Sequence, residues 1–293
     1  MSFQVHLIDG TYELFRHFFA VPSRKTSNGT EIGALRGVLG SVLGLLEQGA
    51  THLAVATDQT IRSFRNDMWP GYKDGSETDP EIVSQFLPLE QGLRALGLQV
   101  WPMVEFEADD ALATGAKMAA KDSRVSQVLI CSPDKDLAQC VGGKIFQWDR
   151  RKNQISGVDE VRDKFGVPPS SIPDYLALVG DAADGFPGLS GWGAKSAATL
   201  LACYGSIEDI PNDASTWQVK VRSSAKLAET LSRGREKAAL FKSLATLRDN
   251  APVSETTDAL LWNGPDASFE EFCTQHELAT LFERTEKLLA DRT

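Results

Sequence analysis

Residues 3–9 read FQVHLID, a short, mostly apolar run that ends in an aspartate. Residues 52–58 (HLAVATD) repeat this pattern, and residues 98–103 (LQVWPM) and 126–131 (QVLICS) are two further apolar runs. Short apolar runs of this length predict buried strands. Three segments between them have helical spacing: residues 31–48, 80–96 and 107–121. Because strands alternate with helices, we expect an α/β fold with a mainly parallel central sheet flanked by helices.

The second half of the chain has a different pattern. Residues 144–156 (KIFQWDRRKNQIS) predict a hairpin with a basic tip, and from about residue 158 the spacing becomes helical. Residues 190–204 (SGWGAKSAATLLACY) predict a glycine-rich turn that leads into a helix, and residues 277–290 predict a short helix near the end. We therefore expect a domain boundary near residue 165.

Composition limits the classes of protein that fit. The chain has 293 residues, of which 42% are hydrophobic and 24% charged, which suits a folded core. The net charge of −10 argues against a nucleic-acid partner unless the acids are gathered in one place to hold cations. The four cysteines and four histidines form no zinc pattern. With no signal peptide and no apolar run of about 18 residues, we expect a cytoplasmic protein with no membrane partner.

Acidic residues stand where a site is expected in a parallel sheet. Asp9 and Asp58 end two apolar runs, Asp134 follows a third, and ligands bind outside the carboxyl ends of such strands. Further acids come in three tight groups: Glu107, Asp109 and Asp110; Asp134 and Asp136; Asp181 and Asp184. Each group alone has a simpler explanation, since acids cap helices and form turns. Together they predict a cluster of carboxylates that hard cations such as Mg²⁺ or Mn²⁺ neutralise, as in two-metal phosphodiester hydrolysis.

Two segments have features that bind phosphates. Residues 190–196 (SGWGAKS) place small residues and Lys195 at the start of a helix, as in a helix-hairpin-helix turn that grips a duplex backbone. Residues 62–75 (RSFRNDMWPGYKDG) mix cations with aromatic rings, which suits a single strand, although a solvated loop fits equally well. Further basic residues are candidates for the same role or ordinary surface positions: Arg150, Arg151, Lys152, Arg222, Lys226, Arg233, Arg235 and Lys237.

Five stretches, in this order, resemble the 5′-nuclease family, which includes the nuclease domain of bacterial DNA polymerase I, phage 5′-exonucleases and flap endonucleases. They are LIDGTYELFRHFFA (7–20), TDQTIRSFRNDMWPGYK (57–73), EADDALA (107–113), SPDKDLAQ (132–139) and VGDAADGFPGLSGWGAKSA (179–197). The resemblance implies a PIN-like catalytic core over residues 1–165 with a helical arch at about 69–90. It also implies a helical DNA-binding subdomain with a helix-hairpin-helix-like motif, and a tail, over residues 166–293. Because no polymerase domain is attached, we expect a stand-alone form.

The resemblance also implies residue roles. Ligands of a first Mg²⁺ or Mn²⁺ are Asp9, Asp58, Glu107 and Asp109, with Asp110 beside them. Ligands of a second ion are Asp134, Asp136, Asp181 and Asp184. Basic residues near the scissile phosphate are Arg16, Arg65 and Lys73. The hairpin at residues 188–197 holds DNA through Gly188, Ser190, Gly191, Trp192, Gly193, Lys195 and Ser196. Relatives often hold a monovalent ion such as K⁺ at this hairpin.

The expected activity is hydrolysis of DNA by a monomer acting on a 5′ single-stranded flap or junction. Three positions depart from the family pattern. The arch carries Ser76 where a basic residue is usual, and Glu77 and Asp79 follow, so this arch is less positive. Gly185 replaces a usual asparagine, and Trp192 replaces an aliphatic residue. The alternatives are a relative that binds branched DNA without cutting it, and a PIN-type ribonuclease.

Overall fold

A computed structural model describes residues 2–292 and divides them into two compact units. The first unit contains residues 2–61, 75–132 and 249–292, and the second contains residues 62–74 and 133–248. Each unit is therefore built from segments that are separated in the sequence. The C-terminal segment from Asp249 belongs to the same unit as the N-terminal strand.

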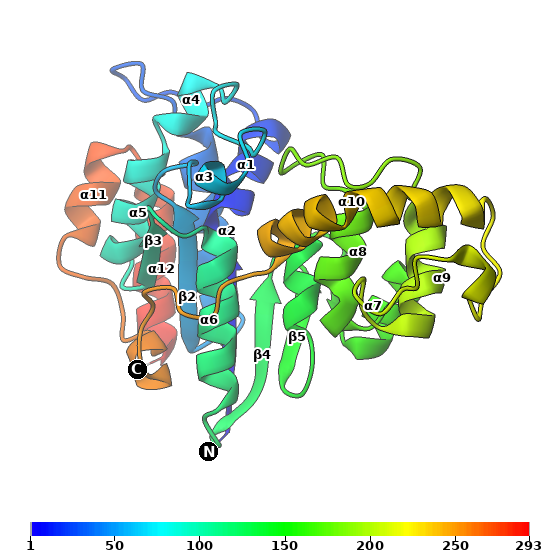
Figure 1. Cartoon of the computed structure of the whole chain (residues 1–293). Coiled ribbons are helices and arrows are strands. Elements are labelled where there is room, and N and C mark those ends of the chain that lie inside the picture. The colour runs from blue at the N-terminus through cyan, green and yellow to red at the C-terminus, as the bar shows by residue number, and fades with distance from the viewer. Residues whose placement is uncertain (1, 293) are drawn as a thin grey trace. The chain divides into compact units, whose positions relative to one another are not determined.

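The first unit is organised around four parallel strands (Figure 1). They are β1 (Phe3–Asp9), β2 (His52–Asp58), β3 (Gln99–Met103) and β4 (Val125–Cys131), in the order β3-β2-β1-β4. All four predicted strands are confirmed, and so is the mainly parallel arrangement. Buried apolar side chains fill β1, β2 and β4, as expected for strands that are covered on both faces.

Helices connect these parallel strands as crossovers. The chain moves in one direction from β1 through α1 (Gly10–Ala20) and α2 (Gly33–Glu47) to β2, and through α4 (Pro80–Val83) and α5 (Phe86–Ala95) to β3. It then reverses through α6 (Ala108–Ala120) to β4, which pairs with the other side of β1. The reversal places α6 on the opposite face of the sheet, in the foreground of Figure 1. It also creates a switch point between β1 and β4, where α/β folds bind ligands.

The helical spacing predicted at residues 80–96 corresponds to two helices, α4 and α5. Pro88 explains the break, because it has no N–H to donate to the carbonyl of Ser84 and its ring would clash with that group in a continuous helix. Helical hydrogen bonding resumes with the amide of Leu89, which donates to the carbonyl of Gln85 at 2.9 Å. Two further helices complete this unit, α11 (Phe269–Gln275) and α12 (Ala279–Arg292). The second of these confirms the helix predicted near the C-terminus.

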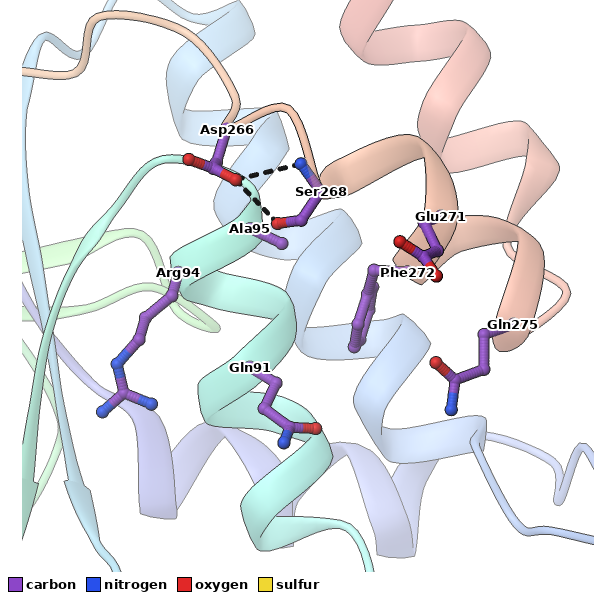
Figure 2. Close-up of a pocket in the computed structure, with 8 residues that line it drawn as sticks. All are labelled: Gln91, Arg94, Ala95, Asp266, Ser268, Glu271, Phe272 and Gln275. Carbon is purple, nitrogen blue, oxygen red and sulfur yellow. Dashed lines mark hydrogen bonds between the residues drawn. The ribbon is translucent and has the colours of Figure 1, made fainter.

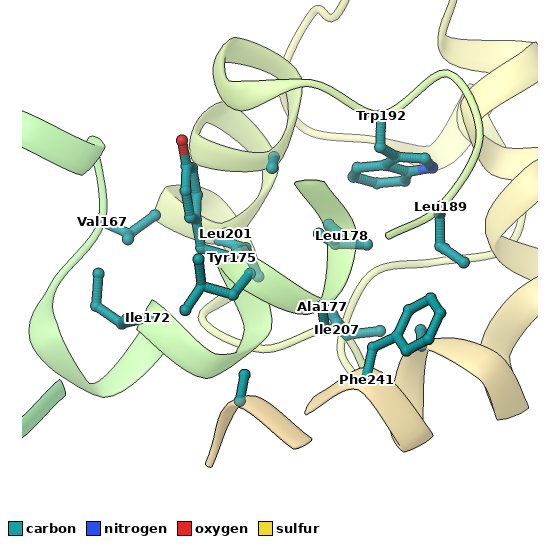
Figure 3. Packing of buried hydrophobic residues seen from close by; sticks show 14 of the residues in the cluster. Val167, Ile172, Tyr175, Ala177, Leu178, Leu189, Trp192, Leu201, Ile207 and Phe241 are labelled. Atoms are coloured by element: carbon teal, nitrogen blue, oxygen red, sulfur yellow. The ribbon is translucent and has the colours of Figure 1, made fainter. Parts of the chain in front are cut away.

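The second unit is mainly helical. It contains α3 (Arg65–Met68), the antiparallel pair β5 (Ile145–Asp149) and β6 (Gln154–Ser156), α7 (Val158–Phe165), α8 (Ile172–Val179), α9 (Ala194–Tyr204) and α10 (Ser224–Ala245). Short 3₁₀ turns lie at Asp136–Cys140, Pro169–Ser171 and Ala214–Thr216. The predicted basic hairpin and the predicted helical second half are both confirmed. Its core joins α8, α9 and α10 through residues such as Leu178, Leu201 and Phe241 (Figure 3).

Charge is distributed unevenly between the units. The first unit has 11 basic and 24 acidic side chains, whereas the second has 19 basic and 16 acidic side chains. The net charge of −10 therefore hides a weakly positive second unit, which removes much of the objection to a polyanionic partner. None of the described helices combines the length and apolar character needed to cross a bilayer.

Candidate metal centre and nucleic-acid interface

Asp9 lies at the carboxyl end of β1, at the switch point of the sheet. Its side chain is 5% exposed and accepts a hydrogen bond from the amide of Tyr12 at 2.8 Å, which caps helix α1. It also accepts a hydrogen bond from the Oγ of Ser132, the residue directly after β4, at 2.8 Å. Two donors thus hold this carboxylate at the edge where a ligand is expected.

Asp58 and the acids of EADD are joined by backbone hydrogen bonds. Asp58 Oδ1 accepts from the amide of Ala108 at 2.8 Å, which ties the end of β2 to the start of α6. Glu107 and Asp110 form a capping box at the same helix start, and both are buried. Asp109 is half-buried. The simpler explanation of EADD as a helix cap is therefore correct for Glu107 and Asp110, and a metal role for them stays a prediction.

The second unit brings three of its predicted ligands together. Carboxylate oxygens of Asp136, Asp181 and Asp184 all lie within 4.8 Å of one another. Asp136 and Asp181 are 4% and 1% exposed. Asp136 Oδ1 is buried and has no hydrogen-bond partner among residues 2–292. Burial, followed by the charges of Asp184, Asp134 and Asp181, holds the pKa of Asp136 well above its usual value.

Two lysines partly balance this cluster. Lys135 Nζ lies 2.7 Å from Asp181 Oδ2, and Lys73 Nζ lies 2.9 Å from Asp184 Oδ1. Burial alone would lower the pKa of Lys135, but its hydrogen bond and charge interaction with Asp181 raise it overall. Lys73 is among the site residues predicted from the sequence, and Lys135 is not. The available signal was its position between two candidate ligands in Asp134-Lys135-Asp136.

Gly185 explains how Lys73 reaches Asp184. Its φ angle is 80°, and a Cβ at this position would lie 2.0 Å from the carbonyl oxygen of Gly71. Without a side chain there, the two segments pack together: Trp69 Nε1 donates to the carbonyl of Gly185 at 3.1 Å, and the amide of Lys73 donates to that of Asp184 at 3.2 Å. This departure from the family pattern therefore has a structural reason.

Asp134 lies beside the three-carboxylate cluster and is exposed. Its carboxylate accepts a hydrogen bond from the amide of Asp136 at 3.2 Å, and its carbonyl accepts one from Gln147 Nε2. The first of these contacts is an aspartate turn, as the simpler explanation of this motif predicts. A ligand role for Asp134 stays a prediction.

The second-unit cluster fits hard divalent cations. Its donors are all carboxylate oxygens, which Mg²⁺ and Mn²⁺ prefer. A buried oxygen of Asp136 without a partner and mutually repelling carboxylates are costly unless positive charge is added. Asp136, Asp181 and Asp184 are therefore suited to holding one such ion.

Two basic residues predicted near the scissile phosphate, Arg65 and Arg16, have defined contacts. Arg65 is 1% exposed, and its Nε donates to the carbonyl of Leu244 at 2.8 Å near the end of α10. A guanidinium in this position stabilises a helix end, and its burial leaves it inaccessible to a phosphate in this structure. Arg16 lies on α1 and donates through Nη2 to Glu13. The predicted roles of Arg65 and Arg16 near the scissile phosphate stay predictions.

The hairpin at residues 188–197 connects α8 to α9. Around Gly191 and Gly193 a side chain would meet nothing within 4 Å, so a ligand can approach their backbone, and Lys195 is exposed. Ser196 Oγ accepts from the amide of Gly193 at 3.1 Å and caps α9. Trp192 is 7% exposed and points into the core near Leu189 and Phe241 (Figure 3). Its indole therefore packs in the core.

The region predicted as an arch begins without a helix. Within the described chain, α3 ends at Met68 and the next helix is α4, which starts at Pro80. Ser76, Glu77 and Asp79 are exposed, and Asp79 caps α4 through a 2.8 Å bond from the amide of Glu81. Residues 69–79 thus form turns in this structure.

An open hollow lies on the first unit between α5 and α11 (Figure 2). Its lining has both charges, and Asp266 accepts hydrogen bonds from the amide and the Oγ of Ser268 at 2.9 and 2.8 Å. It is lined by Gln91, Arg94, Ala95, Asp266, Ser268, Glu271, Phe272 and Gln275. None of the predicted site residues is among them.

Comparison with known families agrees with this arrangement. Residues 4–166 match the N-terminal resolvase-like domain of 5′-3′ exonucleases, and residues 167–268 match their C-terminal SAM fold. The chain belongs to the 5′-3′ exonuclease family. Its class is therefore that of nucleases, which are hydrolases.

Relatives within this family include both long and short proteins. The chain is 35% identical over 273 residues to DNA polymerase I of Rhizobium leguminosarum, covering 88% of this chain and 26% of that protein. It is 34% identical over 209 residues to a 5′-3′ exonuclease of Aquifex aeolicus, covering 70% of this chain and 71% of that protein. The match to DNA polymerase I of Bacillus caldotenax spans 30% of that protein. The chain thus spans less than a third of the polymerases it matches.

Solved structures share the fold at low sequence identity. The T5 5′-exonuclease with bound zinc ions has a TM-score of 0.66 at 17% identity, covering 98% of both chains. The catalytic core of Rad2 in complex with a DNA substrate has a TM-score of 0.64 at 14% identity, covering 98% of this chain and 92% of that one. These similarities confirm the predicted fold class.

Proposed function

We propose that this 5′-3′ exonuclease family member hydrolyses DNA phosphodiester bonds near a 5′ single-stranded flap or junction, using Mg²⁺ or Mn²⁺. The observation that carries the proposal is the buried cluster of Asp136, Asp181 and Asp184, whose carboxylate oxygens lie within 4.8 Å of one another. An all-oxygen cluster suits hard cations and phosphoryl chemistry.

Two ions are proposed, one for each group of carboxylates. Asp136, Asp181 and Asp184, with Asp134 beside them, would hold one ion, and Asp9, Asp58, Glu107 and Asp109 the other, with Asp110 capping the helix beside them. Bound ions of this kind lower the pKa of a water and stabilise the leaving oxygen. Lys73 pairs with Asp184 at 2.9 Å and Lys135 pairs with Asp181 at 2.7 Å, and these ion pairs hold the cluster of the second unit in place. Lys73 is 32% exposed at its side chain, and we assign it the phosphate contact.

DNA would contact the second unit through the start of α9. Lys195 is exposed there, and the backbone at Gly191 and Gly193 is open to close approach by a phosphate. We also propose that the hairpin at residues 188–197 binds K⁺ and that the protein is a monomer. Size-exclusion chromatography tests the monomer, and replacing K⁺ by Li⁺ in binding assays tests the ion.

The test uses a 5′-labelled flap duplex with Mg²⁺, Mn²⁺ or EDTA. We expect metal-dependent release of the flap near the junction, and competition by DNA but not by an RNA of the same structure. Stronger competition by RNA would favour a PIN-type ribonuclease instead. Cleavage in EDTA would contradict the metal requirement.

A second candidate function is binding of branched DNA without cleavage. The observation that favours it is the pairing of Asp181 with Lys135 and of Asp184 with Lys73, which gives the cluster positive charge without a metal. Tight binding of the flap duplex with no cleavage in either metal would support this candidate. Isothermal titration with Mn²⁺ separates the two, because the binding-only protein needs no ion at these carboxylates.

A further inference from the structure

Three charged or polar side chains form a compact group on α1. Arg16 Nη2 donates to Glu13 Oε2, and the same Nη2 lies 2.7 Å from His17 Nε2. His17 Nε2 lies 3.5 Å from Glu13 Oε2. Both hydrogens of Nη2 are therefore directed at side chains of the same helix.

The chemistry of arginine determines the state of His17. A guanidinium only donates hydrogen bonds, so a nitrogen 2.7 Å from it must accept. His17 Nε2 is then unprotonated, and the neutral ring carries its proton on Nδ1. In the other tautomer, a proton on Nε2 would be donated to Glu13 over 3.5 Å. That tautomer would leave two donors, Nε2 and Arg16 Nη2, facing each other at 2.7 Å. The shorter distance decides in favour of the acceptor.

Burial makes this group rigid. The side chains of Glu13, His17 and Arg16 are 2%, 12% and 21% exposed. A Cβ on Gly37 of α2 would lie 2.4 Å from His17 Nδ1, so the imidazole occupies the space that this glycine leaves. Within residues 2–292, neither His17 Nδ1 nor Arg16 Nε has a hydrogen-bond partner. The ring is thus held by packing against α2 on one side and by Arg16 on the other.

The group also has a defined place relative to the candidate metal ligand of β1. Asp9 caps α1, and Glu13 and Arg16 follow it at positions i+4 and i+7, which lie along one face of a helix. Both contacts of the group use Nη2 of Arg16, so we assign its Nη1 hydrogens to a substrate phosphate. A guanidinium fixed by two partners loses less side-chain entropy when it binds a phosphate.

We propose that Glu13 and His17 are positioning residues that fix the guanidinium of Arg16 for contact with the substrate phosphate, with His17 accepting as the Nδ1-protonated tautomer. The contact with substrate rests on the proposed function, whereas the tautomer does not. The sequence alone does not predict this role for His17. The role depends on packing against Gly37, which is distant in the chain.

The first test is a double-mutant cycle on single-turnover cleavage of a 5′-flap duplex. We expect His17→Leu to slow cleavage about 10-fold, and His17→Gln, which keeps an acceptor, to restore the rate to within about 3-fold of wild type. In an Arg16→Ala background, His17→Leu should have no further effect. Equal losses in both backgrounds would overturn the proposal, because a merely structural histidine acts independently of Arg16. His276→Leu, a half-buried histidine against Phe272, is the matched control.

The second test does not need activity. Nitrogen-15 chemical shifts of the His17 ring, assigned with His17→Gln, should show a proton on Nδ1 in wild type, and Arg16→Ala should change the tautomer ratio. A ring protonated on Nε2 would overturn the proposal even if the enzyme cleaves DNA. If wild type does not cleave, the proposed function fails, and the ring shifts still decide whether His17 accepts from Arg16.

Discussion

The buried carboxylates Asp9 and Glu31 of the first unit are held by hydrogen-bond donors, whereas three carboxylates of the second unit face one another. Asp9 accepts from Tyr12 and Ser132, and Glu31 accepts from the amides of Arg24 and Gly33 at 3.0 and 2.8 Å. In the second unit, Asp136, Asp181 and Asp184 converge within 4.8 Å. The first arrangement satisfies its carboxylates with donors, and the second is costly unless positive charge is added.

The same contrast appears in the pKa values. Burial tends to raise the pKa of Glu31, but the hydrogen bonds from Ser23, Arg24 and Gly33 outweigh it and lower the pKa overall. For Asp136, burial and neighbouring carboxylates act together and raise the pKa. Burial alone therefore does not distinguish a structural acid from a candidate ligand. The donors and charges around each carboxylate decide whether its pKa falls, as for Glu31, or rises, as for Asp136.

The largest expected effect comes from removing one carboxylate of the second-unit cluster. Asp136→Asn should reduce metal-dependent cleavage by more than about 10²-fold, because a neutral amide binds a hard cation poorly. DNA affinity should remain close to wild type, and the double variant with Asp134→Asn should behave alike. Single-turnover rates and binding in Ca²⁺ measure this. Asp159→Asn, an exposed acid, is the control; normal turnover by Asp136→Asn would remove the metal assignment.

Removing Lys135, one of the two lysines that balance this cluster, should have an intermediate effect on stability. Lys135→Met leaves the buried Asp181 without its 2.7 Å partner. We expect the free energy of unfolding to fall by about 1–2 kcal/mol in EDTA, less than for a fully buried pair because Lys135 is partly exposed. Mg²⁺ should restore more stability to this variant than to wild type. Urea denaturation measures both, with the exposed Lys152→Met as control; equal gains from Mg²⁺ would contradict the comparison.

The two types of buried acid should respond to pH in opposite directions. The raised pKa of Asp136 destabilises the folded state at neutral pH, and this cost is relieved as pH falls through its folded pKa towards 3.8. The lowered pKa of Glu31 contributes stability that is present above 4.5 and is lost as pH falls below it. Metal-free protein should therefore gain stability from Asp136 on mild acidification, and Asp136→Asn should lack this gain. Glu31→Gln should keep the gain on mild acidification, but it should no longer show the loss of stability below pH 4.5 that Glu31 causes. Urea titrations from pH 8 to 4 compare them; identical profiles for wild type and Asp136→Asn would contradict this assignment.

Most of the fold was predictable because its signals are local. Apolar pattern alone predicts the strands at residues 3–9 and 52–58, and turn residues predict the hairpin around residues 150–153. The helical spacing at residues 80–96 did not show that two helices lie there, because periodicity carries no information on the backbone donor that Pro88 lacks.

Less of the site was predictable, since it depends on contacts between distant residues. Lys135 pairs with Asp181, and Gly185 makes room for Gly71, across long stretches of chain. Trp192 has the same ambiguity, because an aromatic residue in a glycine-rich turn fits either a ligand contact or a core. The packing of α8, α9 and α10 in the structure shows that Trp192 is buried in the core.

The smallest expected effect separates the exposed and buried residues of the hairpin at residues 188–197. Lys195→Ala should weaken DNA binding about 3-fold and reduce the salt dependence by about one phosphate contact. Trp192→Phe should leave the affinity unchanged and lower only the free energy of unfolding, because the indole packs in the core. Fluorescence anisotropy at several salt concentrations measures the first, and thermal unfolding the second. A loss of affinity in Trp192→Phe at unchanged stability would place the indole on the DNA, and the basic character of the second unit would then not be the main source of binding at this turn.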